Sequence, residues 1–262
     1  MPVFKENFHT HTFRCKHAAG DANEYAIAAE KAGMEVLGIS DHSPLPDGWT
    51  SEIRMGMQQL GGYFAAIEKA REESSISVIA GMECDIAERY FSFYRDELLA
   101  SGRCRYLIGA IHYYTHKGED YYAGYIPGSA YLATYTKTII QGIQSGIFSF
   151  IAHPDHFAAG CCRWDDNTRA CVRDIMRAAK AAGVPLEING NGFRKPSVDC
   201  GGARRPPYPW RPFWEEAALC GVKVVLSSDA HRPLDVNASL DRCQALAEEL
   251  GLVRAEMKFI PL

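Results

Sequence analysis

Residues 6–33 read ENFHTHTFRCKHAAGDANEYAIAAEKAG, and they contain the unit that the rest of the chain repeats. The run Glu6–His9 predicts a short strand, and the spacing of apolar residues over Ala22–Ala32 predicts a helix. Asp21 is of the residue type that caps a helix N-terminus, and Gly33 is of the type that follows a helix C-terminus. These residues therefore predict one strand followed by one helix.

The same alternation of a short apolar run and a longer helical pattern recurs along the chain. The other expected strands are Val36–Ile39, Ile76–Ala80, Tyr106–Ile111, Phe148–Ala152, Val184–Ile188 and Val222–Leu226. The other expected helices are Gln58–Glu73, Phe91–Ala100, Ser129–Ser145, Thr168–Ala182 with Asn167 as its N-cap, Pro212–Leu219 and Val236–Leu250. Seven such units with short connections predict a parallel sheet, and seven in a row suit its closure into a barrel. No low-complexity linker divides the chain, so residues 1–262 are expected to form a single α/β domain.

The composition restricts the classes of protein to consider. The chain has 262 residues, of which 47% are hydrophobic and 23% charged, with a formal net charge of -4. A slightly acidic chain gives no electrostatic reason to expect nucleic acid or an anionic membrane as a partner. No apolar run reaches membrane-spanning length, and the first residues lack the layout of a secretion signal. We therefore expect a cytoplasmic protein, and the sequence carries no signal for its oligomeric state.

The nine cysteines predict buried thiols rather than disulfides. Their number is odd and no Cys-x-x-Cys pair occurs, which does not suit a disulfide framework or a thiolate metal site. Cys15 and the adjacent pair Cys161-Cys162 are the positions where ligation or reactivity is the alternative.

Metal-binding residue types gather at the predicted C-terminal ends of the strands. His9 and His11 lie two apart at the end of the first strand, so their imidazoles project to the same side. Later strand ends carry Asp41-His42, Glu83, His112, His153-Pro154-Asp155, Glu187 with Asn189, and Ser228-Asp229-Ala230-His231, and His17 lies in the loop after the first strand. Parallel barrels gather their active-site residues at this face. A single histidine after a strand is more often a hydrogen-bonded loop residue, but so many on one rim predict one site.

Residues around this rim have more ordinary expected roles. His116 and His156 are expected to be solvent-facing loop histidines. Asp41 and Asp155 are candidates for orienting ligand imidazoles, a role that metal sites commonly require. The three most loop-like segments, Ser43–Trp49, Lys117–Gly128 and Gly190–Arg211, are expected to lie over the mouth of the barrel.

The number of donors exceeds the need of one metal ion. Seven histidines together with Glu83 and Asp229 make nine donors, whereas a catalytic zinc needs three protein ligands and an open position. Nine nitrogen and oxygen donors suit two or three ions that share a bridging carboxylate, and such clusters hold both oxygens of a displacement at phosphorus. Mixed imidazole and carboxylate donors suit Zn, Fe or Mn better than Mg or Ca.

The chain resembles the polymerase-and-histidinol-phosphatase (PHP) superfamily in a series of residues that runs through most of its length. The series is His9-x-His11, His17, Asp41-His42, Glu83, His112, His153 and Asp229-x-His231, in the order of the family and roughly its spacing. The neighbouring words Ser40-Asp41-His42-Ser43-Pro44-Leu45-Pro46, Gly109-Ala110-Ile111-His112 and Phe193-Arg194-Lys195-Pro196 agree as well. Among the members, the chain looks most similar to the stand-alone histidinol-phosphate phosphatases.

The resemblance implies a fold and a ligand set. The fold is a distorted seven-stranded (β/α)7 TIM-like barrel with a trinuclear metal site at the C-terminal ends of its strands. The first ion would take His9, His11, Glu83 and Asp229. The second would share Glu83 and add His112 and His153, and the third would take His17, His42 and His231.

The chemistry implied by the resemblance is hydrolysis of a phosphate monoester by a metal-bridging hydroxide. Asp229, His231 and His153 are the residues expected to take part in catalysis, and the sequence does not say which of them moves the proton. Arg194 is the first candidate for binding the phosphate, because related phosphatases carry an arginine in a similar context. Arg163 is the second candidate, and for both the alternative is a solvated surface arginine.

The substrate implied is small and phosphorylated, with L-histidinol phosphate as the first expectation. Specificity is expected to reside in Gly48–Met57 and Tyr113–Tyr125. Another phosphomonoester or a nucleotide is the alternative substrate. A non-catalytic metal-binding PHP module is the alternative of a different class, and the complete set of ligand positions disfavours it.

Overall fold

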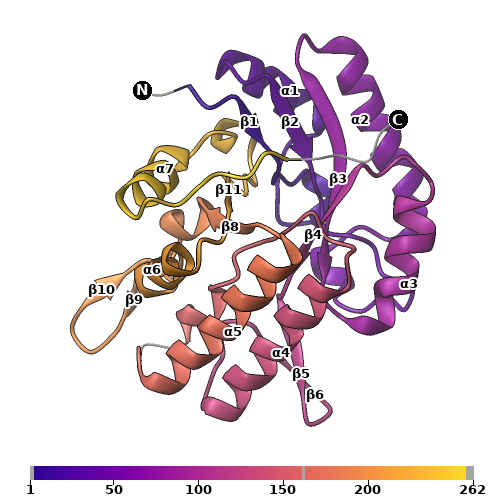
Figure 1. Ribbon diagram of the computed structural model, residues 1–262. Helices are drawn as coiled ribbons and strands as arrows, with labels where there is room; N and C mark the ends of the chain where they lie inside the picture. The colour runs from indigo at the N-terminus through magenta and orange to yellow at the C-terminus, as the bar shows by residue number, and fades with distance from the viewer. Residues whose placement is uncertain (1–2, 161–162, 258–262) are drawn as a thin grey trace.

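Seven parallel strands form one sheet in the computed structural model, which describes residues 3–160 and 163–257 (Figure 1). Their order in the sheet is β1-β2-β3-β4-β7-β8-β11, and each neighbouring pair is parallel. The strands are β1 (Glu6–Asn7), β2 (Val36–Ile39), β3 (Ser77–Asp85), β4 (Tyr106–Ala110), β7 (Phe150–Ile151), β8 (Leu186–Asn189) and β11 (Val224–Ser227). The predicted parallel sheet of seven strands is confirmed.

The first and the last strand meet just beyond their ends and nearly close the sheet into a barrel. Thr10 and Ala230 form a parallel bridge, and the His11 amide donates to the Ala230 carbonyl at 2.8 Å. Because all seven strands point the same way, their C-terminal ends share one rim. The loops that carry His9, His11 and Asp229 are therefore joined by backbone hydrogen bonds.

Helices cover the outside of the sheet (Figure 1). They are α1 (Ala22–Lys31), α2 (Leu60–Glu73), α3 (Phe91–Phe93), α4 (Ser129–Gln144), α5 (Asp166–Ala182), α6 (Arg211–Cys220) and α7 (Leu240–Glu249). Asp21 caps α1 in a capping box with Glu24, as its residue type predicts. The cap of α5 is Asp165 and not the predicted Asn167, because the Asp165 carboxylate accepts from the Thr168 amide at 2.9 Å. In part of the molecule the helices pack in sequence, α4 on α5 and α5 on α6.

Several elements depart from the sequence-based expectation. Strand β3 continues to Asp85, so Glu83 lies inside it rather than after it. Gly81 does not end the strand, because it lets the backbone pass the Tyr106 ring, whose nearest atom would lie 2.2 Å from an added Cβ. Two antiparallel hairpins were not expected: β5 (Tyr113–His116) with β6 (Glu119–Tyr122), and β9 (Val198–Asp199) with β10 (Arg204–Arg205). A wide π-helical turn, Tyr94–Leu99, follows α3, and α7 starts only at Leu240, after a short 3-10 helix at Pro233–Asp235.

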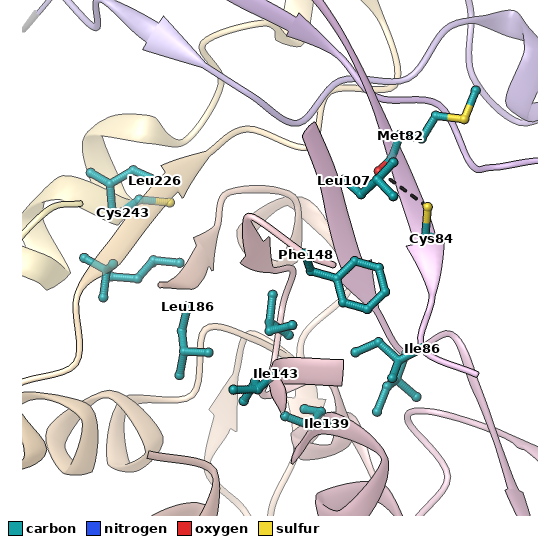
Figure 2. Close-up of a cluster of buried hydrophobic side chains, with 14 of the residues drawn as sticks. Met82, Cys84, Ile86, Leu107, Ile139, Ile143, Phe148, Leu186, Leu226 and Cys243 are labelled. Carbon is teal, nitrogen blue, oxygen red and sulfur yellow. Dashed lines mark hydrogen bonds between the residues drawn. The ribbon is translucent and has the colours of Figure 1, made fainter. Parts of the chain in front are cut away.

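A hydrophobic core fixes the helices against the sheet (Figure 2). Ile139 and Ile143 of α4 lie beside Ile86 and Phe148, and all four side chains are buried. Full burial of one such side chain contributes about 1.5–3 kcal/mol. This packing holds the strand ends, and the side chains that follow them, in fixed positions.

Cys15, Cys84, Cys104 and Cys243 are buried free thiols, and Cys220 is a half-buried one. The pair Cys161-Cys162 lies outside the described residues. Within residues 3–160 and 163–257, no helix combines the length and the apolar character that crossing a bilayer requires.

Candidate metal centre

The nine predicted ligands come together at the C-terminal rim of the barrel. Eight of them line one cavity of about 300 Å³: His11, His17, His42, Glu83, His112, His153, Asp229 and His231. The ninth, His9, is fully buried next to them, with its Nε2 3.4 Å from Glu83 Oε1. The structure thus gathers residues that are up to 222 positions apart in the sequence, from 9 to 231.

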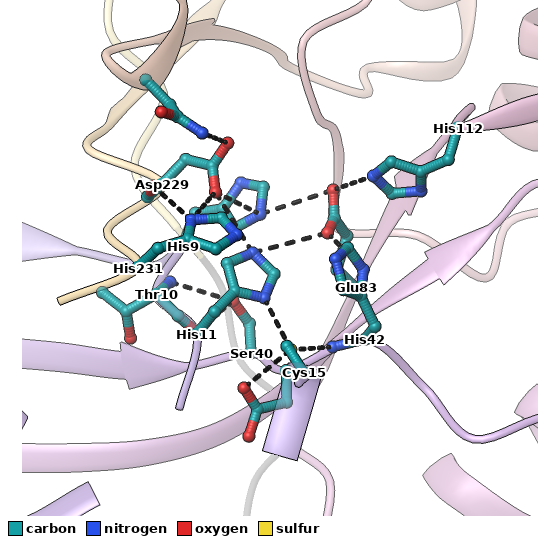
Figure 3. Close-up of polar contacts among 12 residues, drawn as sticks. His9, Thr10, His11, Cys15, Ser40, His42, Glu83, His112, Asp229 and His231 are labelled. Carbon is teal, nitrogen blue, oxygen red and sulfur yellow. Dashed lines mark hydrogen bonds and ion pairs between the residues drawn. The ribbon is translucent and has the colours of Figure 1, made fainter. Parts of the chain in front are cut away.

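Glu83 lies at the centre of the cluster, with imidazoles around both carboxylate oxygens (Figure 3). Its Oε1 is 3.0 Å from His153 Nε2, 3.4 Å from His9 Nε2 and 3.5 Å from His112 Nε2. Its Oε2 is 2.9 Å from His42 Nδ1 and 3.5 Å from His11 Nε2. A carboxylate with five imidazoles around it has the position of a bridging ligand.

Asp229 faces the same space from the opposite side. Its Oδ1 is 3.2 Å from His11 Nε2 and 3.7 Å from His9 Nε2. Its Oδ2 accepts from the side-chain amides of Asn189 and Asn191, both at 3.1 Å, which fixes the plane of the carboxylate. One oxygen is therefore held by the protein while the other points into the cluster.

His17 and His231 complete the cluster on its exposed side. Their Nε2 atoms face each other at 3.1 Å. His17 Nδ1 lies 2.6 Å from the Cys15 carbonyl and His231 Nδ1 lies 3.1 Å from the Asp229 carbonyl. Each carbonyl can only accept, so each Nδ1 carries a proton and each Nε2 of a neutral ring presents a lone pair. Two lone pairs that face each other suit a shared cation.

Orphaned polar atoms test whether the residues fit metal ions. Among the described residues, His9 Nε2, His11 Nε2, His42 Nδ1 and Asp229 Oδ1 are buried and have no hydrogen-bond partner. Buried polar atoms are nearly always paired, and these four unpaired atoms face one cluster. Three groups with donor atoms within 4.8 Å of one another involve these atoms: His9, His11 and Glu83; His11, His42 and His231; and His42, Glu83 and His112. The donor set fits two or three divalent transition metal ions.

The cluster shifts the pKa values of its members in opposite directions. Burial lowers the pKa of His112, but the carboxylates of Glu83 and Asp85 outweigh it and raise this pKa to about 10. Burial and the neighbouring His11 lower the pKa of His231 to about 4. Burial opposes ionisation of Glu83, yet the imidazoles around it hold its pKa well below the usual value. In the absence of metal, the cluster thus keeps protons on some imidazoles to balance its carboxylates.

Each of several ligands is oriented by a partner behind it. His9 Nδ1 is 2.7 Å from Glu187 Oε1, and His112 Nδ1 is 3.0 Å from Asp85 Oδ1. Asp85 in turn forms a buried ion pair with Arg54. Such partners fix the tautomer and the ring orientation of metal-binding histidines.

The two aspartates predicted to orient imidazoles behave differently from each other. Asp41 reaches His11 through a thiol, because Cys15 Sγ lies 3.0 Å from Asp41 Oδ1 and 3.2 Å from His11 Nδ1. Asp155 accepts from the Trp210 amide at 2.6 Å and from the Trp214 indole at 3.0 Å. Asp155 therefore anchors the start of α6, and the expectation that it holds an imidazole was wrong.

Two of the predicted ligands have an uncommon backbone conformation. His153 has φ 29° and Asp229 has φ 49°, which lie in the left-handed region that non-glycine residues rarely adopt. Each residue lies two positions after the end of a strand, and Glu187 Oε2 accepts from the His153 amide at 3.0 Å. Backbone strain of this kind persists where the surroundings hold it in place, as they do here at the metal-binding rim.

Neither arginine expected to bind phosphate reaches the metal cavity. The Arg194 guanidinium donates to the carbonyls of Ala238 at 3.0 Å and Ser228 at 2.8 Å, so it supports the backbone beside Asp229. Arg163 is exposed and lines a separate cavity near the N-terminus of α4. The cation among the described residues that line the metal cavity is Lys195, which the sequence analysis did not select.

The aromatic side of the cavity was not predicted from the sequence. His156, expected to face solvent, is 4% exposed, and its Nε2 lies 2.8 Å from the Tyr122 hydroxyl. A short 3-10 helix at His156–Ala159 turns the ring back toward His153, 5.2 Å away between ring centroids. Tyr208 lies 5.0 Å from the same ring. Only the tyrosine-rich segment that includes Tyr122 gave a sequence signal for this side.

The predicted specificity segments contribute to the same cavity. Ile53 comes from the first segment, and Tyr113 and Tyr122 come from the second. His116, in contrast, lies outside the lining: its ring stacks on Tyr131 at 4.3 Å, and its Nδ1 is 2.7 Å from the Thr134 hydroxyl. His116 is half-buried rather than solvent-facing.

Comparison with known proteins places this site in a family. Residues 7–191 match the model of the PHP domain. The chain is 31% identical over 240 residues to a Deinococcus radiodurans protein named "Probable histidinol-phosphatase", which covers 87% of this chain and 86% of the relative. It is 24% identical over 274 residues to the histidinol-phosphatase of Bacillus subtilis, covering 91% of this chain and 99% of the relative. The fold is similar to that of a Lactococcus lactis histidinol phosphate phosphatase in complex with zinc, L-histidinol and phosphate (TM-score 0.74, 17% identity, 98% of this chain and 99% of the other).

Proposed function

Because the chain belongs to the PHP domain family, we propose that it is a metal-dependent phosphatase that hydrolyses L-histidinol phosphate to L-histidinol and phosphate. The observation that carries the proposal is the cluster around Glu83, in which buried donor atoms converge without partners among the described residues. The substrate follows from the relatives, since the Deinococcus and Bacillus proteins are named as histidinol-phosphatases. We further propose that residues 1–262 form one phosphoesterase domain that acts in the cytoplasm.

We assign the nine residues to three ligand sets, two of which share Glu83, as the family resemblance implies. The first consists of His9, His11, Glu83 and Asp229, whose facing atoms lie 3.2–3.7 Å apart. The second shares Glu83 and adds His112 and His153, and the third consists of His17, His42 and His231. Two observations support this assignment. His17 and His231 present their Nε2 atoms to each other, and Glu83 lies between the histidines of the first set and those of the second.

The exposure of the ligands indicates where the ester enters. The side chains of His9, Glu83 and His11 are at most 1% exposed, whereas His112 is 14% and His231 24% exposed. The ester therefore approaches from the side of His112 and His231, and the phosphoryl group meets the cluster there. When bound, the ions supply an activated water at neutral pH and neutralise the phosphoryl oxygens.

The chain's own residues hold the reacting groups and move the proton. Asp229, clamped by Asn189 and Asn191, keeps one oxygen toward the cluster and can accept a proton from the attacking water. His231 and His153 flank the same space, and their Nε2 atoms face other groups of the cluster. The proton that Asp229 accepts can then pass to the leaving alkoxide, which departs on the exposed side beside His231.

Lys195 takes the role that was expected of Arg194 and Arg163. It lines the cavity, and its Nζ lies 5.8 Å from the centroid of the Tyr208 ring, beside the aromatic side. A flexible ammonium can reach a phosphoryl oxygen that no metal ion neutralises. Arg194 acts indirectly, by holding the backbone carbonyls of Ser228 and Asp229.

The aromatic side of the cavity suits the organic part of the ester. Tyr113, Tyr122, Tyr208 and His156 line it, and Tyr122 is tied to His156 by a hydrogen bond. Aromatic faces accept a planar imidazole by stacking and an ammonium by cation–π attraction. A cavity of about 300 Å³ suits a small ester better than a nucleotide.

Metal content and phosphate release together test the proposal. The purified protein is loaded with Mn or Zn, its metal stoichiometry is measured, and phosphate release is followed with histidinol phosphate beside sugar phosphates and nucleotides. We expect two or three ions per chain and fastest release from histidinol phosphate. Fewer than two ions, or no hydrolysis of any monoester, would contradict the proposed chemistry. Turnover of other esters without turnover of histidinol phosphate would select the alternative substrate.

A further inference from the structure

We propose that Cys15 is a positioning residue of the metal centre: its thiol, held by Asp41, fixes the His11 imidazole so that Nε2 faces the metal ions. The inference rests on the proposed metal centre, and it does not depend on which ester is hydrolysed. Cys15 is fully buried and contacts the cluster from behind the His11 ring (Figure 3). The mechanism proposed above assigns it no role.

Three hydrogen-bonding groups surround the sulfur. Cys15 Sγ lies 3.2 Å from His11 Nδ1, 3.0 Å from Asp41 Oδ1 and 3.2 Å from the His42 amide nitrogen. These contacts involve two residues of the proposed ligand sets and one carboxylate. A buried cysteine usually packs among apolar side chains. The sulfur of Cys15 lies among polar groups instead.

Counting protons around the junction sets the direction of each hydrogen bond. Asp41 already accepts from the Thr12 amide and the Thr12 hydroxyl, both at 2.5 Å, so its carboxylate acts as acceptor. The single thiol proton is donated to Asp41, and the sulfur lone pairs accept from the His42 amide and from His11 Nδ1–H. His11 is thereby held in the tautomer that leaves the Nε2 lone pair free.

The free nitrogen of His11 points at the cluster. His11 Nε2 lies 3.2 Å from Asp229 Oδ1 and 3.5 Å from Glu83 Oε2, and within the described residues it has no hydrogen-bond partner. The sulfur is on the other nitrogen's side of the ring. Cys15 thus acts on the metal site through His11, as a carboxylate does behind other ligand imidazoles.

The alternative is that Cys15 is itself a ligand. The donor atoms of His11, Cys15 and Asp41 are close enough together to hold an ion. Those atoms, however, are already joined to one another or to Thr12 by hydrogen bonds, whereas the unpaired atoms of the cluster lie on the Nε2 side of His11. The geometry favours a thiol that orients over a thiolate that binds.

The local backbone is shaped to place this sulfur. Thr12 caps the short 3-10 helix Phe13–Cys15, and Lys16 follows with φ 65°. The reversal lets the Cys15 carbonyl accept from His17 Nδ1 at 2.6 Å. Cys15 therefore contacts His11 and the His42 amide through its side chain and His17 through its backbone.

The test compares Cys15→Ala and Cys15→Ser with the wild type and with Cys104→Ala. Cys104 is a matched control, because it is also fully buried and its thiol donates to the Tyr106 carbonyl at 3.3 Å. Metal affinity and stoichiometry are measured by competition with a chelator on the metal-free proteins, with thermal unfolding of the metal-free form as a control for folding. Co(II)-loaded protein is examined for thiolate-to-metal charge-transfer absorption.

We expect Cys15→Ala to lose roughly 10- to 100-fold in affinity for at least one ion, as partners behind ligand histidines typically do when removed. Cys15→Ser should stay within several-fold of the wild type, because a hydroxyl donates and accepts as the thiol does. Cys104→Ala should match the wild type, and the Co(II) spectrum should lack thiolate absorption.

Three results would overturn the inference. A thiolate band in the wild type that disappears in Cys15→Ala makes Cys15 a ligand. If Cys15→Ala binds metal with the affinity of the wild type, the thiol does not position His11 and only packs. If Cys15→Ala does not fold, Cys15→Ser decides, because a large loss of affinity in a stably folded Cys15→Ser also contradicts the inference. These measurements need no ester, so a failure of the proposed hydrolysis would leave their outcome readable.

Discussion

Glu187→Gln is the substitution whose effect can be worked out most fully from the structure. The Glu187 carboxylate is buried and accepts three hydrogen bonds. Its Oε1 faces His9 Nδ1 at 2.7 Å, and its Oε2 accepts from the His153 amide at 3.0 Å and the Asn189 side chain at 2.8 Å. Glutamine has the same size but offers one acceptor and one donor group. It can therefore satisfy only one side at a time.

Each orientation of the new amide has a different consequence. With its oxygen toward His153 and Asn189, its NH2 group faces His9, whose proton must move to Nε2, the atom needed for the metal. With its oxygen toward His9, the His153 amide and the Asn189 side chain both face a donor. A buried donor left unsatisfied costs about 1–3 kcal/mol, so the second orientation costs at least about 2 kcal/mol. At 1.4 kcal/mol per factor of ten, this is a loss of about 30-fold in metal affinity.

The assay is chelator competition on metal-free protein, with urea unfolding of the same samples. Metal-free Glu187→Gln can adopt the first orientation, so we expect a free energy of unfolding close to that of the wild type and a metal affinity about 30-fold lower. Glu216→Gln is the matched control, because Glu216 is also buried and pairs with Arg173, away from the metal ligands. Wild-type metal affinity in Glu187→Gln would refute the reasoning. A loss of folding stability as large as the loss of metal binding would place the effect in folding instead.

Three further predictions follow from other parts of the site. Lys195→Met should lower kcat/KM by roughly 10- to 100-fold with metal content unchanged, because it removes one charge-assisted contact worth about 1.5–3 kcal/mol. Exposed Lys223→Met is the control, and equal kinetics of the two variants would show that Lys195 does not bind the phosphate. Metal affinity should weaken as the pH falls from 9 to 6. The pKa of about 10 keeps His112 protonated over this range in the metal-free protein, so the ion must displace that proton. Calorimetry in buffers of different ionisation enthalpy measures the proton release on metal binding, and a lack of proton release would contradict the prediction. Arg54→Met should destabilise the protein by about 3–5 kcal/mol in urea unfolding, because it removes the guanidinium partner of the buried Asp85 carboxylate. Exposed Arg71→Met should change stability by less than about 0.5 kcal/mol, and a similarly small change in Arg54→Met would show that the ion pair is dispensable.

Regular spacing made the barrel predictable from the sequence. The strands are short apolar runs between helices, and their parallel order fixes which ends meet, so the metal-binding rim followed from local patterns alone. Glu83 shows the limit of this reasoning, because it was expected after a strand and lies inside one. Its position depends on the close passage of Gly81 over the Tyr106 ring, a contact between residues far apart in the chain.

The side chains that face the substrate were less predictable than the ligands. Arg194 and Lys195 are neighbours in the sequence, and residue type favoured the arginine for phosphate. The structure turns Arg194 toward backbone carbonyls and leaves Lys195 at the cavity, because the 3-10 helix Asn191–Arg194 ends between them. The direction of a side chain after such a turn does not follow from local spacing.

The partners behind the ligands were also beyond the reach of the sequence. The sequence predicts a buried thiol at Cys15, with ligation or reactivity as the alternative, and it marks Glu187 only as one more polar residue at a strand end. Their roles depend on distances of about 3 Å between residues 4 and 178 positions apart. Only the three-dimensional arrangement shows which nitrogen of His9 or His11 each partner occupies.

Titration of the metal-free protein with Mn(II), with phosphate release from histidinol phosphate measured after each addition, tests the central claim most directly. The cluster around Glu83 predicts no release without metal and a rise in rate only as the second and third ions per chain bind. Full activity with one ion per chain, or no release at saturating metal, would contradict the claim that these nine residues form a multinuclear phosphatase site.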